Sequence, residues 1–245
     1  MDLKNILNEV AERIKKSDEY KQLDKEEQQR FEQMVSADSL SLLPVGGGPS
    51  VDYSAPTKGH ALQLKVSLKG AKPPIWRRLL VSDTLTLHQL HEVIQAAMGW
   101  TNFHLYEFQK GNVYFEKIEE EEESSMSKFN EIYDSKEALV GNALVKEGQK
   151  LAYTYDFKNN WEHTILLEKI EDKEVDGPIC LKGRRATPPE AVGGVDNYMH
   201  ALKLLEDGAA AGEEDDFYRD LLQGEDAGHF DLQKTNDELR RLDFK

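Results

Sequence analysis

Residues 151–170 read LAYTYDFKNNWEHTILLEKI and alternate aromatic or aliphatic side chains with polar ones. This period of two is typical of a β-strand with one buried face, and it predicts strands at residues 151–157 and 161–170. The connection at residues 158–160 contains two asparagines, which tolerate the left-handed backbone conformation of tight turns. The side chains expected to form two facing rows across this hairpin are Tyr153, Tyr155, Phe157, Trp161, His163, Ile165 and Leu167.

Upstream of the hairpin, a strand at residues 62–68 is predicted by the same alternation, and two prolines at 73–74 turn the chain into a second strand, IWRRLLV. Asp83 or Thr84 can cap a following helix, and Gly99 stands where a helix commonly ends. The apolar face of this helix comprises Leu87, Leu90, Ile94, Ala97 and Met98.

Further strands are expected at residues 103–109 and 112–116, whereas the acidic run at residues 119–123 is interpreted as a solvated loop. Residues 178–197 lack a regular period and are interpreted as irregular. Together the elements predict an α+β protein: a mixed sheet with a crossing helix, β-grasp-like at its start, followed by C-terminal helices. Those last helices are expected at residues 198–205, 217–222 and 236–242.

The first 59 residues of the chain differ in composition from the rest. Residues 44–59 hold three prolines and four glycines in sixteen positions, which predicts a flexible linker. The chain therefore divides into a helical extension at residues 1–43, the linker, and a domain at residues 60–245. Apolar residues at helical spacing in the extension need burial, so residues 1–35 are expected to bind a protein partner or a second copy. This stripe comprises Leu3, Ile6, Leu7, Val10 and Ile14.

Charge and cysteine content restrict the class of protein. The chain has 31 basic and 46 acidic residues, a net charge of −15, which opposes binding to phosphate backbones and makes nucleic acid an unlikely partner. Its single cysteine allows no internal disulfide, and no apolar run is long enough for a membrane span. The N-terminus lacks the pattern of a secretion signal, so we expect a cytoplasmic location.

Asp156 and His163 are the first candidates for chemistry, because both lie beside the hairpin turn. A bulge could bring the carboxylate to the imidazole, and such a pair can transfer protons. The competing interpretation is a packed cross-strand core in which Asp156 caps amides of the turn. On the predicted helix, His88 and His91 are three residues apart, but their spacing matches no zinc-helix motif, and no metal site is predicted.

The loop CLKGRRATPPEAVGG at residues 180–194 holds further candidates. Arg184 and Arg185 could bind a carboxylate or phosphate, and salt bridges with local acids are the alternative. Cys180 is more typical of a small buried hydrophobe than of a nucleophile. No GxSxG, EF-hand, CxxC or dinucleotide motif is present, which favours a non-enzymatic interpretation and leaves any cofactor unidentified.

Three segments, in order, resemble the plasmid pRiA4b open-reading-frame-three family over about residues 60–245. The resemblance implies a compact α+β domain, association with plasmids and transposable elements, and no established reaction. The segments are KPPIWRRLLVSDTLTLHQLHEVIQAAMGWTNFHLYEF, YDFKNNWEHTILLEKI and CLKGRRATPPEAVGGVDNY.

The resemblance also implies a set of recurrent residues, and this chain departs from the family pattern at several positions. Lys158 and Asn159 replace a glycine and an acidic residue in the hairpin, and Thr187, Ala191 and Val192 replace two cysteines and an aspartate. A cysteine-rich metal site is therefore not expected. The recurrent residues fall on His104, Asp156, Trp161, Glu162, His163, Cys180, Arg185, Pro188, Pro189, Glu190, Gly193 and Gly194.

Three functional hypotheses remain open. The leading one is a non-catalytic binding or interaction protein, an accessory of a mobile element, whose ligand-binding candidates are Trp161, Arg184, Arg185, Gly193 and Gly194. The second is a hydrolase or other enzyme, metal-assisted in one version, which uses Asp156, His163, His104 and Glu190 around one cleft. The third is DNA binding through Arg77, Arg78, Arg184 and Arg185, which requires all four on one exposed face.

Overall fold

A computed structural model describes residues 13–17, 20, 25, 28, 51–118, 131–207, 213–222 and 226–244. The chain forms two units, Met1–Val51 and Asp52–Lys245. In the first unit, residues 13–15 are helical, and most of the stripe predicted to bind a partner lies outside the described residues. The predicted acidic loop at residues 119–123 lies outside them as well.

The second unit is built on one sheet of eight described strands, in the order β5-β4-β3-β6-β7-β1-β2-β8. Neighbouring strands run antiparallel except β4 and β5, which are parallel, so the sheet is mixed. The strands are β1 Ala61–Leu68, β2 Trp76–Ser82, β3 Tyr106–Lys110, β4 Val113–Glu116, β5 Glu131–Asp134, β6 Lys150–Tyr155, β7 Trp161–Glu171 and β8 Ile179–Arg184.

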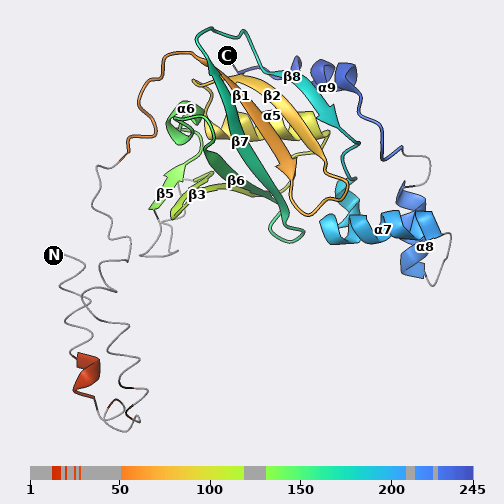
Figure 1. Cartoon of the computed structure of the whole chain (residues 1–245), viewed down its shortest axis with the longest axis horizontal. Helices are drawn as coiled ribbons and strands as arrows, with labels where there is room; N and C mark the ends of the chain where they lie inside the picture. Colours follow the sequence, from red (N-terminus) through yellow and green to blue (C-terminus); the bar gives the residue numbers. More distant parts are fainter. Residues whose placement is uncertain are drawn as a thin grey trace. The chain divides into compact units, whose positions relative to one another are not determined.

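One long helix, α5 (Leu87–Met98), crosses the back of the sheet (Figure 1). It begins at a capping box: Thr86 Oγ1 accepts a hydrogen bond from Gln89 N, and Gln89 Oε1 accepts one from Thr86 N. It ends at Gly99, whose φ of 74° is the left-handed conformation that glycine adopts without strain. The predicted caps were wrong by two or three residues, because Asp83 instead accepts hydrogen bonds from Thr57 and Gly59.

The core lies between α5 and the sheet. Every second residue of β1 faces the helix and is almost fully buried, as the alternation predicted. Complete burial of a leucine or isoleucine side chain stabilises the fold by roughly 1.5–3 kcal/mol. The opposite face of β1, β2 and β7 carries no helix of the described chain (Figure 1). The core residues of β1 and α5 include Leu62, Leu64, Val66, Leu87, Leu90, Val93 and Ile94.

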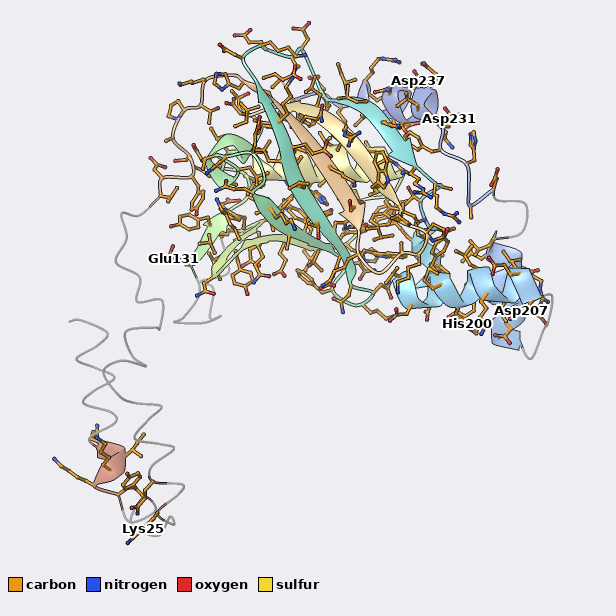
Figure 2. All side chains as sticks on the ribbon, viewed as in Figure 1. Lys25, Glu131, His200, Asp207, Asp231 and Asp237 are labelled. Atoms are coloured by element: carbon orange, nitrogen blue, oxygen red, sulfur yellow. The ribbon has the colours of Figure 1, made fainter. Side chains whose placement is uncertain are left out.

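Of the remaining described helices, α6 lies between β5 and β6 in the sequence, and the others follow β8. Asp231 caps the last of them, α9, by accepting a hydrogen bond of 2.9 Å from Lys234 N (Asp231 and Asp237 are labelled in Figure 2). Asn236 of α9 covers the edge of β8, since its amide donates to Cys180 O and its Oδ1 accepts from Cys180 N. The helices are α6 Val140–Ala143, η1 Glu190–Val192 (a 3₁₀ turn), α7 Val195–Asp207, α8 Glu213–Leu222 and α9 Leu232–Leu239.

The α+β class, the mixed sheet and the crossing helix were predicted and are confirmed. The order of the strands was not predicted. Strand β3, which follows α5 in the sequence, pairs with β4 and β6. The place beside β1 belongs to β7, which arrives from the later hairpin. The expectation of irregular structure at residues 178–197 was wrong, because β8, η1 and the start of α7 lie there.

The end of the predicted flexible linker, residues 52–59, packs against the domain. Tyr53 is 7% exposed, and its ring meets the rings of Phe115 and Tyr133 edge-on. Its carbonyl accepts hydrogen bonds from Leu139 N and from the side chain of Asn142. The compact unit Asp52–Lys245 therefore includes this part of the predicted linker. None of the described helices is long and apolar enough to cross a membrane.

Candidate functional site

The hairpin of β6 and β7 brings the predicted aromatic rows together. Tyr155 pairs with Trp161 and Tyr153 with His163, and all four side chains are almost fully buried. Phe157 departs from the row: it lies in the turn and is 45% exposed. The hairpin side chains therefore form part of the core, as the structural interpretation of the sequence expected.

Asp156 shapes the turn that follows β6. Its φ is 58°, and Asn160 has a φ of 49°, so the turn contains two left-handed residues that asparagine and aspartate tolerate well. One carboxylate oxygen accepts a hydrogen bond of 3.1 Å from Lys158 N, and the other accepts one of 2.6 Å from Asn159 Nδ2. Asp156 thus caps the turn, with one hydrogen bond to each oxygen of its carboxylate.

A second contact joins β6 to the loop at residues 185–194. Tyr155 Oη donates a hydrogen bond of 2.8 Å to Glu190 Oε1. The other oxygen of Glu190 accepts bonds from both the amide (2.8 Å) and the hydroxyl (2.6 Å) of Thr101. Trp100 Nε1 also donates to Pro188 O, at 2.9 Å. These bonds fix the start of the segment at residues 101–105, which connects α5 to β3.

That segment forms one wall of a cavity of about 510 Å³. Side chains from α5, from the end of β4 and from the hairpin turn form the other walls. Phe103 and Leu105 at this cavity are 84% and 70% exposed, unusually high values for large apolar side chains. The residues that line it from α5 and from this segment include His88, His91, Asn102, Phe103, His104 and Leu105.

Hydrogen bonds run from the core to this cavity through His91. Gln95 Nε2 donates to Tyr153 Oη (2.9 Å), Tyr153 Oη lies 2.7 Å from His91 Nδ1, and His91 Nε2 lies 2.5 Å from Asn102 Oδ1. Burial lowers the pKa of His91 to about 3, so its ring is neutral and carries one proton. Because Asn102 Oδ1 can only accept, that proton is assigned to Nε2, and Tyr153 donates to Nδ1.

A parallel contact positions His88. Its Nδ1 lies 2.6 Å from Tyr106 Oη, which is also 2.8 Å from Ser135 Oγ. The Tyr106 ring stacks on His91 at a centroid distance of 3.7 Å. Burial raises the pKa of Tyr106 to about 12, so its hydroxyl stays protonated at neutral pH. The cavity therefore has a wall of hydrogen-bonded rings, among them neutral His91, beside exposed apolar side chains.

The four residues assigned to the enzyme hypothesis lie in different surroundings. His104 lines the cavity, and its Nε2 is 3.7 Å from Asp156 Oδ2, beyond a direct hydrogen bond. Glu190 lines a different cavity, between α5 and α9, of about 410 Å³. His163 is enclosed in the core, where both ring nitrogens have no hydrogen-bond partner in the described structure. Only His104 and Asp156 of this set are close together.

The predicted ligand-binding residues are placed mostly in structural roles. Trp161 is fully buried and packs on Trp100 at 5.1 Å, whereas Arg184 is exposed on β8. Gly194 approaches the hairpin turn so closely that a Cβ would lie 2.8 Å from Asn159 O, and its φ is 110°. Gly193 and Arg185 also have positive φ, of 78° and 66°. This loop therefore packs against the turn.

The four arginines of the DNA-binding hypothesis do not share an exposed face. Arg77 is 3% exposed; it donates hydrogen bonds to Ala97 O and Thr187 Oγ1 beneath the sheet. Arg78 projects from the opposite face and binds Glu168 through two nitrogens.

Cys180 is buried, and burial raises the pKa of its thiol, which opposes a nucleophilic role.

Sequence reasoning singled out His88, His91 and His104 but missed the exposed apolar side chains of Phe103 and Leu105 at the cavity. The segment from Phe103 was predicted as a strand, but β3 begins only at Tyr106. Among the described residues, no group of three or more His, Cys, Asp or Glu side chains is arranged to bind a metal ion.

The structure defines an α+β protein with one mixed sheet, a crossing helix and a cavity that is lined in part by the first half of that helix. The sequence profile of the plasmid pRiA4b ORF-3-like proteins matches residues 60–238. The chain belongs to this family.

Two relatives extend the comparison. The uncharacterized protein y4hQ of Sinorhizobium fredii is 38% identical over 150 residues, which are 60% of this chain and 74% of the relative. The second relative is a protein of unknown function from Methanosarcina mazei Go1 with a crystal structure. Its sequence is 32% identical to this chain, and its structure superposes with a TM-score of 0.60. The match covers 73% of this chain and 97% of the archaeal protein, so the domain fold recurs in an archaeon.

Proposed function

We propose that this protein is a non-catalytic binding protein, an accessory of a mobile element, that takes an apolar group of its partner into the cavity at residues 102–106. The exposure of Phe103 and Leu105 at the cavity carries the proposal. Large apolar side chains gathered at a concave site are typical of a binding surface, and they have no role in the core.

The walls of the cavity support binding rather than catalysis. His91 is neutral and bonded at both ring nitrogens, and the Tyr106 hydroxyl contacts both His88 and Ser135. These groups are held rigidly, as the polar groups of a preformed ligand pocket are. The mobile-element part of the proposal rests on the family, whose description refers to a plasmid reading frame.

The fluorescent probe 8-anilinonaphthalene-1-sulfonate tests the apolar cavity. We expect the wild-type protein to enhance its emission and the double variant Phe103→Ser/Leu105→Ser to lose most of that enhancement. The matched control, Val145→Ser/Leu232→Ser, removes two exposed apolar side chains elsewhere and should keep it. Equal emission from both variants would contradict the proposal.

The N-terminal unit is proposed to recruit a protein partner or a second copy through residues 1–35. Because Tyr53 belongs to the core, the deletion that tests this should stop at residue 51. A change of mass by light scattering on deletion of residues 1–51, with unchanged circular dichroism of the sheet, supports self-association. An unchanged mass argues against self-association and leaves a separate partner to be sought.

Acid–base catalysis is a second candidate, favoured by the approach of His104 to Asp156 at the cavity. A neighbouring carboxylate orients an imidazole for proton transfer. Hydrolysis of p-nitrophenyl acetate by the wild-type protein, reduced in His104→Gln, would support it. Equal rates for the two proteins would remove it.

A further inference from the structure

The face of the sheet turned away from α5 carries a row of basic side chains. Residues paired directly across antiparallel strands project to the same face. Lys65 of β1 pairs with Arg78 of β2, and Arg78 pairs with Lys182 of β8. In the next row Trp76 pairs with Arg184. Three neighbouring strands thus present four cations on one face, and we call these five residues the basic sheet face.

One carboxylate lies among these cations. Arg78 binds Glu168 through Nε (2.5 Å) and Nη2 (2.8 Å), with a further hydrogen bond from Gln63 to Glu168. Lys65, Lys182 and Arg184 have no ion pair with any residue in the described ranges. Four cations and one carboxylate leave three positive charges in a protein whose net charge is −15.

The basic sheet face also has an apolar component. Lys65 Nζ lies 5.2 Å from the centre of the half-buried Trp76 ring, and Arg78 Cζ lies 5.4 Å from it. Beside them on β8, Ile179 and Leu181 are 44% and 40% exposed. Cations beside exposed aliphatic side chains are complementary to a segment that mixes carboxylates with apolar residues.

We propose that the basic sheet face binds an acidic, partly apolar segment of a protein partner. The bidentate contact of Arg78 with Glu168 shows that this surface accommodates carboxylates. Lys65, Lys182 and Arg184 provide the charges for additional carboxylates, and Ile179 and Leu181 contact the apolar side chains of the segment. This surface is separate from the cavity at residues 102–106 and faces away from α5.

A single strand of nucleic acid fits these observations less well. Binding to single strands combines cations with aromatic rings on which bases stack. The ring of Trp76, the aromatic side chain of this surface, already carries two cations, so a base would have to displace them. The net charge of −15 also opposes a long polyanion that extends beyond the three strands.

Fluorescence anisotropy of the full-length protein with a fluorescein-labelled peptide, Glu-Asp-Phe-Glu-Asp-Leu-Glu-Asp, tests the proposal. We expect saturable binding at low ionic strength that weakens as salt is added. The triple variant Lys65→Glu/Lys182→Glu/Arg184→Glu should bind at least about tenfold more weakly. A triple variant of exposed lysines elsewhere, Lys136→Glu/Lys146→Glu/Lys203→Glu, has the same net charge and should stay within about twofold of the wild type.

Three outcomes overturn the proposal. The first is absence of peptide binding by the wild-type protein at low ionic strength. The second is equal weakening in both triple variants, which reports net charge rather than this surface. The third is tighter binding of labelled oligothymidylate than of the peptide, with loss in the first triple variant, which assigns the surface to nucleic acid. Circular dichroism of each variant confirms that it is folded.

Discussion

Tyr155 and Glu190 are 35 residues apart in the sequence and are joined by a hydrogen bond of 2.8 Å. Through its other oxygen Glu190 holds Thr101, and the Tyr155 hydroxyl accepts a bond of 3.1 Å from Phe103 N. Burial raises the pKa of Tyr155 to about 12, and the hydrogen bond to Glu190 adds to the shift. The pair therefore links the hairpin, the loop after β8 and the wall of the cavity.

Removal of the Tyr155 hydroxyl should loosen this wall. Tyr155→Phe leaves Glu190 Oε1 and Phe103 N without their partner, and we expect unfolding to require about 1–3 kcal/mol less free energy. Hydrogen exchange of the Phe103 amide should also accelerate. Tyr114→Phe, whose hydroxyl accepts a bond from Gln109, is the matched control with a smaller effect. Similar losses for both variants in urea unfolding would contradict a specific role for Tyr155.

The chain of bonds through His91 predicts a particular tautomer. If Tyr153 donates to Nδ1 and Asn102 accepts from Nε2, then Nε2 carries the proton. Long-range ¹H–¹⁵N NMR of the imidazole should show a protonated Nε2 and an unprotonated Nδ1, unchanged from pH 8 to about pH 5, because the pKa of His91 is about 3. A protonated Nδ1 at neutral pH would contradict this assignment, because His91 would then donate its hydrogen bond to Tyr153 Oη.

His163 predicts a pH dependence of stability. Burial lowers its pKa to about 4, below the value near 6.5 of an exposed histidine, so the unfolded chain binds the proton more tightly. The stability that depends on a neutral His163 is therefore present above pH 6.5 and is lost as the pH falls toward 4. Between pH 7 and pH 5 this group should remove about 2 kcal/mol from the free energy of unfolding.

The variant His163→Leu separates this contribution from the rest of the protein. Neither ring nitrogen of His163 has a hydrogen-bond partner in the described structure, so an aliphatic residue of similar volume should be neutral or stabilising at pH 7. It should also reduce the stability lost between pH 7 and pH 5. Urea unfolding at both pH values measures this, and an unchanged pH dependence would contradict the assignment to His163.

Asn236 should protect the edge of the sheet. Its side chain binds both the N–H and the C=O of Cys180, groups that an edge strand otherwise exposes to other chains. We expect Asn236→Ala to lower the free energy of unfolding by about 1–2 kcal/mol and to promote concentration-dependent association. Gln233→Ala removes an exposed amide from the same helix and should do neither. Equal behaviour in unfolding and light scattering would argue against edge protection.

The sequence predicted those elements whose pattern is local. The alternation in β1, the apolar face of α5, its end at Gly99 and the facing rows of the hairpin all follow from spacing within one or two elements. The pattern did not reveal β8, because β8 alternates poorly and owes its place to pairing with distant β2 and to Asn236 of α9. Tyr53 was assigned to the linker because the contacts that bury it come from residues distant in the sequence, such as Phe115.

The candidate site was predicted less well than the fold. Asp156 was anticipated as the cap of the turn, and His104 does lie near it. The cavity itself depends on the path of residues 101–105, which Glu190 fixes from a distant loop. No local pattern in the sequence encodes that contact, so the exposure of Phe103 and Leu105 emerged only from the structure.

The most direct test of the binding cavity is NMR mapping with a small apolar probe. Indole is titrated into the ¹⁵N-labelled full-length protein while backbone amide shifts are recorded. The proposed function predicts saturable changes confined to amides around the cavity, at residues 102–106, 117–118 and 157, and their loss in Phe103→Ser/Leu105→Ser. Absence of changes at millimolar indole, or changes scattered over the sheet, would contradict it.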